Sequence, residues 1–204
     1  MLSQSQMIQN KHKIAVFHFI SGPSGRKTTL SAGLFYRLKT KGYDAELVPE
    51  LVKRYIWKMR KSPEKVQVIN NQHLMSSKHY KSYHTIVDAN EIDAIVLDGS
   101  PLNGLWYNRN NPDNTSNVEL TERMIIEKFH ENADEDTGKV LNVVFYLERM
   151  PETPYSERGR IHTESEAKQM DKEILESLER FSIPFVHITS ESDEEIFTKA
   201  LEYL

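Results

Sequence analysis

Short apolar runs alternate along the chain with longer stretches in which hydrophobic and polar residues are mixed. Five runs have the length and near-continuous hydrophobicity of strands buried on both faces: residues 13–20, 44–48, 93–98, 141–147 and 184–189. The intervening stretches have helical spacing: residues 27–41, 50–60, 64–89, 117–133, 164–181 and 193–203. Strands that alternate with helices form βαβ units with right-handed crossovers. The pattern therefore predicts an α/β fold, a three-layer sandwich with a five-stranded parallel sheet.

Local signals mark the ends of several predicted helices. Gly42 follows the first helical stretch, at a position where glycine commonly ends a helix. Two sequences have the spacing of capping boxes and predict the starts of the last two helices: Thr163 with Glu166, and Ser192 with Glu195. The polar segment 103–116 lacks helical periodicity, and we expect it to be a binding loop. Its Trp106 and Tyr107 either stack on a base or pack against neighbouring helices.

Length and composition place these elements in one domain. The chain has 204 residues, of which 38% are hydrophobic and 27% charged, as is usual for a globular domain with its own core. We expect residues 1–11 to be a polar, flexible tail and residues 12–204 to form a single domain. There is no cysteine, which excludes disulfides, cysteine-ligated zinc and thiol catalysis. The apolar runs are too short to cross a bilayer and no signal peptide is recognisable, so a cytoplasmic protein without membrane partners is expected.

The charge balance argues against an extended nucleic-acid surface. Lys and Arg total 26 and Asp and Glu total 30, which gives a formal net charge of −4. Proteins that follow a phosphate backbone usually carry an excess of positive charge. The sequence KRYIWKMRK at residues 53–61 places aromatic residues among basic ones. This run keeps a local nucleic-acid site open as an alternative.

The sequence FISGPSGRKTTL at residues 19–30 joins the first predicted strand to the next helix. It is close to the pattern G-x-x-x-x-G-K-[ST] of phosphate-binding loops. In such a loop Lys27 reaches the β- and γ-phosphates, the Thr28 hydroxyl holds Mg²⁺, and backbone N–H groups cradle the anion. The alternative is an ordinary Gly-Pro turn before a helix. We predict that a nucleotide binds here, with these contact residues: Ser21, Gly22, Ser24, Gly25, Arg26, Lys27, Thr28 and Thr29.

The loop departs from the pattern at both of its glycine positions, which are occupied by Ser21 and Arg26. Gly22 and Gly25 remain available for positive φ angles. A β-carbon at position 26 is a modest steric problem, and it excludes a working loop only if that residue must be left-handed; the arginine could add a cation near the phosphates. A loop retained for binding with little turnover is therefore an alternative. No guanine-specific N-K-x-D sequence is present, which favours ATP over GTP.

Two carboxylates follow predicted strands at the sheet edge where the loop lies. Asp98 ends the strand AIVLD, where P-loop proteins place an acid that holds Mg²⁺. We predict Thr28 and Asp98 as the metal-binding pair, the alternative for Asp98 being a cap of the next segment. Glu50 follows the second strand and could act as a catalytic group that accepts the proton of an attacking hydroxyl. It could equally be a favourable first-turn acid of the next helix, and both interpretations stay open.

The segment 149–163 is expected to be a lid, because it is long, polar and rich in arginine. Phosphoryl transfer builds charge on the equatorial oxygens, and an arginine on a mobile loop can stabilise it. We predict Arg158 and Arg160 as catalytic residues and Arg149 as a further candidate phosphate ligand. The alternative is a solvated, charged loop.

The order of four sequences resembles a known family: GPSGRKTTL, AELVPELVKR, AIVLDGSPL, and FYLER followed by GRIHTESEAKQMDKEI. Over about residues 13–203 the chain is similar to phage and bacterial P-loop proteins that are related to the nicotinamide riboside kinase domain. Deoxynucleoside, thymidylate and adenylate kinases belong to the broader group. The resemblance implies ATP and Mg²⁺ as cofactors, a nucleoside- or nucleotide-like acceptor, and the host cytoplasm if the chain is phage-encoded. It implies matching roles for a set of residues: Lys27, Thr28, Glu50, Asp98 and Arg160.

The sequence thus predicts a P-loop phosphotransferase, an ATP-dependent and Mg²⁺-assisted kinase. Its acceptor would be a nucleoside- or nucleotide-like small molecule. Two alternatives stay open: a polynucleotide or modified-base DNA kinase, and a nucleotide-binding regulatory or inhibitor protein with little turnover. A homodimer is also open.

Overall fold

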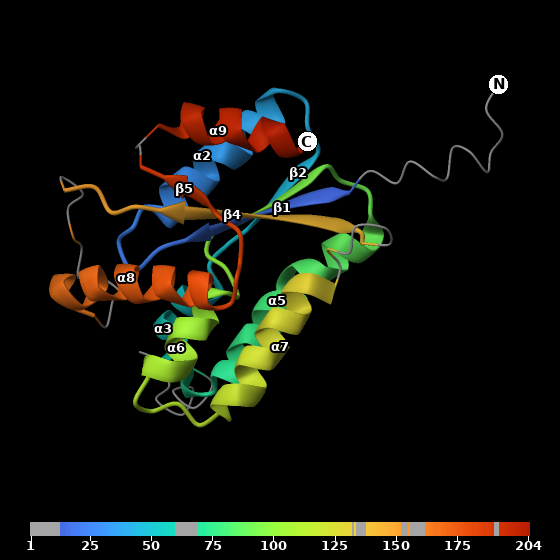
Figure 1. Cartoon of the computed structure of the whole chain (residues 1–204). Helices are drawn as coiled ribbons and strands as arrows, with labels where there is room; N and C mark the ends of the chain where they lie inside the picture. Colours follow the sequence, from blue (N-terminus) through green and yellow to red (C-terminus); the bar gives the residue numbers. More distant parts are fainter. Residues whose placement is uncertain are drawn as a thin grey trace, which may run out of the picture.

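Five parallel strands form the sheet that organises the molecule (Figure 1). The computed structural model describes residues 13–59, 69–131, 133, 138–151, 155, 162–189 and 192–204. The strands are β1 (Ile14–Ile20), β2 (Ala45–Val48), β3 (Ala94–Leu97), β4 (Val140–Leu147) and β5 (Val186–Ile188). Their order is β2-β3-β1-β4-β5, and every neighbouring pair is parallel. The predicted five-stranded parallel sheet is confirmed.

The central strand explains why the sequence is almost continuously apolar here. β1 pairs with β3 on one side and with β4 on the other, and all seven of its residues are buried. A strand that has neighbours on both sides and helices on both faces contacts no solvent, so it does not alternate. Phe17 of β1 stacks on Phe145 of β4 with ring centroids 5.7 Å apart.

Helices cover both faces of the sheet, as a three-layer sandwich requires (Figure 1). α2 (Lys27–Thr40) and α9 (Asp193–Ala200) lie on one face and share a hydrophobic cluster with the strands. The other helices lie on the opposite side: α3 (Leu51–Met59), α5 (Gln72–Ala89), α6 (Asn103–Asn110), α7 (Val118–Glu131) and α8 (Glu164–Arg180). A 3₁₀ turn, η2 (Leu201–Tyr203), follows α9.

The three local signals for helix ends agree with the structure. Thr163 accepts a hydrogen bond from the N–H of Glu166, whose carboxylate accepts one from the Thr163 N–H, so both halves of the capping box are present. Ser192 caps α9 by accepting from the Glu195 N–H. Gly42, with φ of +90°, comes directly after the C-cap of α2. These local signals were sufficient because capping depends on residues within one turn.

The prediction of a loop over residues 103–116 is wrong for its first half, which forms the helix α6. The Asn, Gly and Tyr residues of this helix have low intrinsic helix propensity, so the sequence shows no clear signal. Leu105 and Trp106 are buried in the core beneath the sheet, and burial of that face outweighs propensity. The indole Nε1 of Trp106 also donates to Glu173 Oε2 at 2.6 Å. Packing, not base stacking, is therefore the role of Trp106 in this structure.

Candidate functional site

The predicted site residues that the structure describes follow the ends of the strands. In an open α/β sheet, ligands bind beyond the carboxyl ends of the strands, at the point where the strand order reverses. β1 leads into the phosphate-loop sequence, and its two neighbours in the sheet, β3 and β4, lead to Asp98 and Arg149. β2 leads to Glu50, one strand beyond Asp98. The structure thus brings together segments that lie far apart in the sequence.

Side chains of the loop after β1 donate hydrogen bonds to the loop's own carbonyl groups. The Nζ of Lys27 donates to the carbonyl oxygens of Ser21 and Gly22, both at 2.9 Å. The buried Ser21 hydroxyl, at the first glycine position of the pattern, contacts Gly22 O at 3.2 Å and Gly25 O at 3.3 Å. A β-carbon on Gly25 would lie 2.1 Å from Ser21 Oγ. Position 25 therefore accepts only glycine while Ser21 keeps this place.

Arg26, at the second glycine position of the pattern, has a backbone conformation that glycine adopts more easily than other residues. Its φ is 62° and its ψ is 12°, which is the left-handed region. For a residue with a β-carbon this conformation costs roughly 1–2 kcal/mol, a cost that a folded domain tolerates. The expectation that left-handed geometry would exclude an arginine is therefore wrong. The expectation of positive φ angles at Gly22 and Gly25 is wrong too, because in this loop Ser24 (61°) and Arg26 (62°) have them instead. The side chain also donates from Nη2 to Glu148 O at 3.1 Å, which ties the loop to the end of β4.

The start of α2 favours an anion. The helix begins at Lys27, it has no acidic residue in its first turn, and Arg26 at the N-cap makes no side-chain capping bond. The first N–H groups of a helix have no acceptor within the helix, and the helix dipole places partial positive charge there. Phosphate groups bind at such helix starts.

Thr28 and Asp98 form an oxygen-rich pair beside this helix start. The Thr28 hydroxyl donates to Asp98 Oδ1 at 3.1 Å, and Asp98 is buried. Mg²⁺ prefers oxygen ligands and is commonly held by one or two protein groups together with water and substrate phosphates. Among the described residues no group of three or more His, Cys, Asp or Glu side chains could hold a metal. With two oxygen groups, the pair fits an ion that phosphate groups help to bind.

A buried histidine supports the turn that carries Asp98. His18 of β1 makes hydrogen bonds through Nδ1 to Ser100 Oγ at 2.9 Å and through Nε2 to Asn142 Oδ1 at 3.0 Å. Ser100 Oγ also accepts from the Leu102 N–H at 3.1 Å. Burial lowers the pKa of His18 to about 4. This side chain therefore stays neutral near pH 7 and holds the turn after β3 by hydrogen bonds alone.

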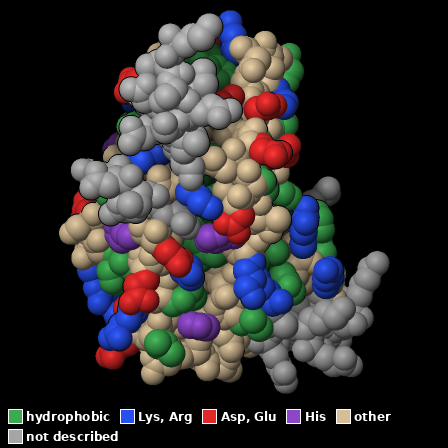
Figure 2. Space-filling view, turned by 90° about the vertical axis from the view of Figure 1, so that its right-hand side faces the viewer, with side chains coloured by type: hydrophobic (Ala, Val, Ile, Leu, Met, Phe, Trp, Pro, Cys, Tyr) green, Lys and Arg blue, Asp and Glu red, His purple; other side chains and the backbone are tan. Residues whose placement is uncertain are grey.

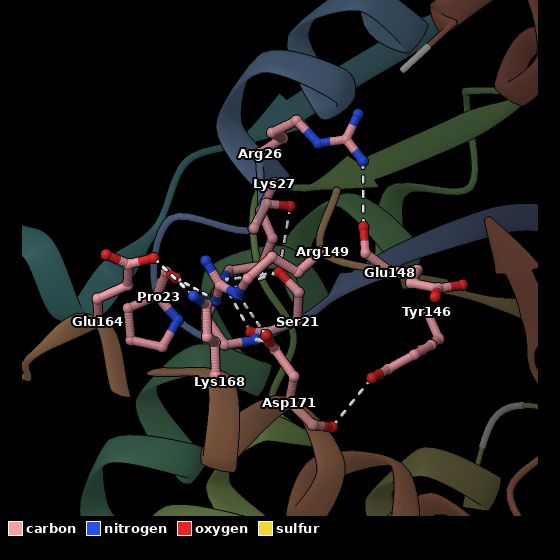
Figure 3. A network of polar contacts seen from close by, with 12 residues as sticks. Ser21, Pro23, Arg26, Lys27, Tyr146, Glu148, Arg149, Glu164, Lys168 and Asp171 are labelled. Atoms are coloured by element: carbon pink, nitrogen blue, oxygen red, sulfur yellow. Dashed lines mark hydrogen bonds and ion pairs between the residues drawn. The ribbon is translucent and has the colours of Figure 1, made fainter. Parts of the chain in front are cut away.

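Asp171 of α8 is a residue that the sequence analysis missed. Its Oδ1 accepts from the Gly22 N–H at 2.7 Å, and its Oδ2 accepts from Arg149 Nε at 2.6 Å. Arg149 in turn donates from Nη2 to Pro23 O at 2.7 Å (Figure 3). Gly22 is required here because a β-carbon would lie 2.6 Å from Asp171 Oδ1 and 2.9 Å from the carbonyl oxygen of Ala167.

A signal for Asp171 was present in the sequence. α8 buries a stripe of residues at helical spacing that includes Ala167, Met170 and Ile174. Asp171 lies on this stripe, four residues after Ala167, and it is buried too. Because a carboxylate is almost never fully buried without a partner, an acid on the apolar side of an amphipathic helix points to a buried cationic or N–H partner.

The remaining predicted residues are placed less completely. Glu50 is half-buried and directly precedes the first residue of α3, so its position is compatible with both interpretations. Arg158 and Arg160 lie outside the described residues, as does the predicted tail at residues 1–11. Of the arginines predicted in the lid, Arg149 is the one whose contacts the structure describes.

None of the described helices combines the length and the apolar character that a membrane span requires.

Comparison with known proteins places the chain in a family. Residues 16–195 match the family model described as AAA domain. No curated protein matches the sequence. Shikimate kinase from Acinetobacter baumannii in complex with shikimate is similar in structure, with a TM-score of 0.50 and 10% sequence identity over 97% of this chain and 95% of that one.

A deoxyadenosine kinase structure from M. mycoides, with bound dATP, has a TM-score of 0.53 and 17% identity, over 94% of this chain and all of that one (100%). At such identities the similarity concerns the fold. The family model, by contrast, covers most of the sequence. The chain therefore belongs to the AAA domain family and has the α/β fold of P-loop kinases.

Proposed function

We propose that the protein is a P-loop kinase that transfers the γ-phosphate of ATP to a nucleoside- or nucleotide-like small molecule with the help of Mg²⁺. One observation carries the proposal: the Thr28–Asp98 hydrogen bond lies directly beside the loop that Lys27 closes. A loop that suits phosphate, a lysine, and an oxygen pair that suits Mg²⁺ at one sheet edge together support the proposal. An ordinary Gly-Pro turn would not require this combination.

In this proposal each site residue has a separate role in phosphoryl transfer. An acceptor oxygen forms a bond to the γ-phosphorus, the bond from that phosphorus to the bridging oxygen breaks, and ADP leaves. Lys27 would exchange its contacts with loop carbonyls for the β- and γ-phosphate oxygens, where negative charge accumulates. Thr28 and Asp98 would hold Mg²⁺, which neutralises phosphate charge. Glu50 would accept the proton that the acceptor hydroxyl loses.

The acceptor class rests on two supports. The fold is similar to that of a deoxyadenosine kinase, and the net charge of −4 does not favour a polyanionic substrate. On the face shown in Figure 2, basic and acidic side chains are mixed, so this face is not uniformly positive or negative. These features support a small acceptor of the nucleoside or nucleotide class.

A polynucleotide acceptor is the second candidate, because α3 is basic and partly aromatic. The helix carries Lys53 and Lys58, and Trp57 is 53% exposed. However, Lys53 Nζ lies 5.5 Å from the centre of the Trp57 ring, and Lys58 Nζ lies 5.6 Å from that of Tyr55. Both cations therefore already contact rings of their own helix, which leaves less of each ring for stacking with a base.

Phosphoryl transfer from γ-labelled ATP tests the proposal. The acceptors would be nucleosides, nicotinamide riboside, nucleoside monophosphates and single-stranded oligonucleotides, each with Mg²⁺. We expect label on a nucleoside or a nucleotide, and loss of that label in Lys27→Ala. Lys39→Ala is the matched control, because Lys39 lies on the same helix but pairs with Asp44 at 3.5 Å. ATP binding without transfer to any acceptor would contradict the kinase and support a regulatory protein.

A further inference from the structure

Arg149 is fixed on one side only. Its Nε donates to Asp171 Oδ2 and its Nη2 donates to Pro23 O, at 2.6 and 2.7 Å. In a guanidinium group these two nitrogens form one edge of a rigid plane. The third nitrogen, Nη1, lies in the same plane but away from that edge. It is buried and has no hydrogen-bond partner among the described residues.

A buried cationic N–H group without a partner is costly, so this nitrogen needs an acceptor. We propose that Arg149 is a phosphate-binding residue of the nucleotide site and that Asp171 is its positioning residue. The ligand would be an anionic phosphate oxygen, which Nη1 would contact. This inference rests on the proposed function, because it assigns one more residue to the same nucleotide site.

The surroundings of Arg149 suit an anion. The Arg149 and Asp171 side chains are only 10% and 11% exposed, so their charges are weakly screened by solvent. Arg149 directly contacts the loop through Pro23, and Arg26 and Lys27 belong to the same loop (Figure 3). Of these cations Arg149 bonds to the Asp171 carboxylate, and Glu164 near Arg149 pairs with Lys168 at 2.8 Å. Three cationic side chains thus lie on the loop or against it, which suits the binding of a phosphate group.

Asp171 links the arginine to the loop itself. One carboxylate oxygen holds the Gly22 N–H and the other holds Arg149. The backbone carbonyl of Asp171 accepts from the Tyr146 hydroxyl at 2.9 Å, which fixes this turn of α8 to β4. Because both oxygens are engaged, the carboxylate fixes the direction of the guanidinium plane relative to the loop. Loss of its charge should therefore misplace Nη1 without removing Arg149.

The competing interpretation is that Arg149 only fastens β4 to the loop. A purely structural role would lower stability and leave the affinity for phosphate groups unchanged in a folded variant. The two interpretations therefore differ in phosphate affinity. Inorganic tripolyphosphate serves as a probe that has the phosphates but neither base nor ribose.

Calorimetric titration of the full chain with ATP and with tripolyphosphate, in the presence of Mg²⁺, tests the inference. Arg149→Lys keeps the charge but has a single nitrogen, which cannot make all three contacts. We expect it to weaken both ligands by a similar factor, on the order of 10- to 100-fold, which is the usual effect of losing a charge-assisted hydrogen bond. Asp171→Asn, whose amide oxygen can still accept from Gly22, should weaken both ligands by a smaller factor.

Arg37→Lys is the matched control. Arg37 also forms a two-contact pair with an aspartate of another helix, at 2.8 and 3.2 Å from Asp193, but between α2 and α9. It should leave both affinities within about twofold. Thermal unfolding checks that each variant is folded, and Asp171→Asn decides the question if Arg149→Lys does not fold.

The outcomes separate this inference from the proposed function. Unchanged ATP and tripolyphosphate affinities in folded Arg149→Lys and Asp171→Asn would overturn the inference and leave the proposed function standing. Weaker ATP binding with unchanged tripolyphosphate binding would also overturn it, because Arg149 would then act on the base or ribose. A wild-type chain that binds neither ligand would overturn both. Parallel loss of both ligands, whether or not phosphate is transferred, would support the role of Arg149.

Discussion

The left-handed backbone of Arg26 makes a sharp prediction about two substitutions at one position. Arg26→Ala and Arg26→Gly both remove the side chain, and with it the hydrogen bond from Nη2 to Glu148 O. The difference between the two variants therefore reports the backbone alone. With φ of 62° and ψ of 12° at this position, glycine should be the more stable choice.

The magnitude follows from two opposing effects. A left-handed residue with a β-carbon costs roughly 1–2 kcal/mol relative to glycine in the folded state. In the other direction, glycine lowers the free energy of unfolding by about 0.4–1 kcal/mol relative to alanine, because it gives the unfolded chain more conformational freedom. The free energy of unfolding of Arg26→Gly should therefore exceed that of Arg26→Ala by about 1 kcal/mol, which corresponds to roughly 2–4 °C in the melting temperature of a chain of this size.

Thermal and urea unfolding of the two variants measure this difference. Lys41 provides the matched control position, because this exposed C-cap residue has φ of −92°. There Lys41→Gly should be no more stable than Lys41→Ala. If the alanine and glycine variants of position 26 were equally stable, or if the alanine variant were more stable, Arg26 would not be left-handed in solution and the reasoning from its φ angle would be refuted.

Three further predictions concern the loop, the metal pair and the buried histidines. Gly22→Ala should lower the free energy of unfolding by about 1–3 kcal/mol in urea titrations, because its β-carbon would lie 2.6 Å from Asp171 Oδ1; an unchanged value would show that α8 does not pack on the loop. Asp98→Asn should raise the Mg²⁺ concentration needed for half-maximal phosphoryl transfer, on the order of tenfold, and an unchanged Mg²⁺ titration would remove Asp98 from the metal pair. Burial lowers the pKa of both His18 and His79 to about 4, so each stays neutral when folded and takes up a proton when unfolded below pH 6.5. The stabilisation that comes from keeping these histidines neutral is therefore complete above about pH 6.5 and is lost as the pH falls towards 4. Between pH 7 and pH 5 the free energy of unfolding should fall by about 2 kcal/mol for each histidine. His79→Leu should shrink the difference between urea unfolding free energies at these two pH values, and an undiminished difference would contradict the buried, neutral state of His79.

Much of the fold was predictable because it depends on short stretches of sequence. The apolar runs predicted all five strands of the sheet, since strands buried on both faces have no room for polar residues. The capping box at Thr163 predicted the start of α8, because the bonds involved span only three residues. The helix α6 was missed because its burial, and not its propensity, stabilises it.

The candidate site likewise has residues that were predictable from the sequence and residues that were not. Lys27 and Thr28 were identifiable because the loop, the lysine and the helix start are consecutive in the chain. The backbone conformation of Arg26 was not, since a sequence states which residue is present and not which φ angle the neighbouring strands impose on it. Asp171 was not found either, although its place on the buried stripe of α8 was a usable signal.

By itself, therefore, the sequence determined the elements of this protein and the residues of its phosphate loop. The tertiary structure decided which distant residues complete the site. Asp171 reaches Gly22 across 149 positions of the chain, and His18 reaches Ser100 across 82. The physical reason is the strand order β2-β3-β1-β4-β5, which places the ends of β3 and β4 on either side of the loop after β1. Contacts of this kind depend on how whole elements pack together, and no local pattern of hydrophobic and polar residues records that arrangement.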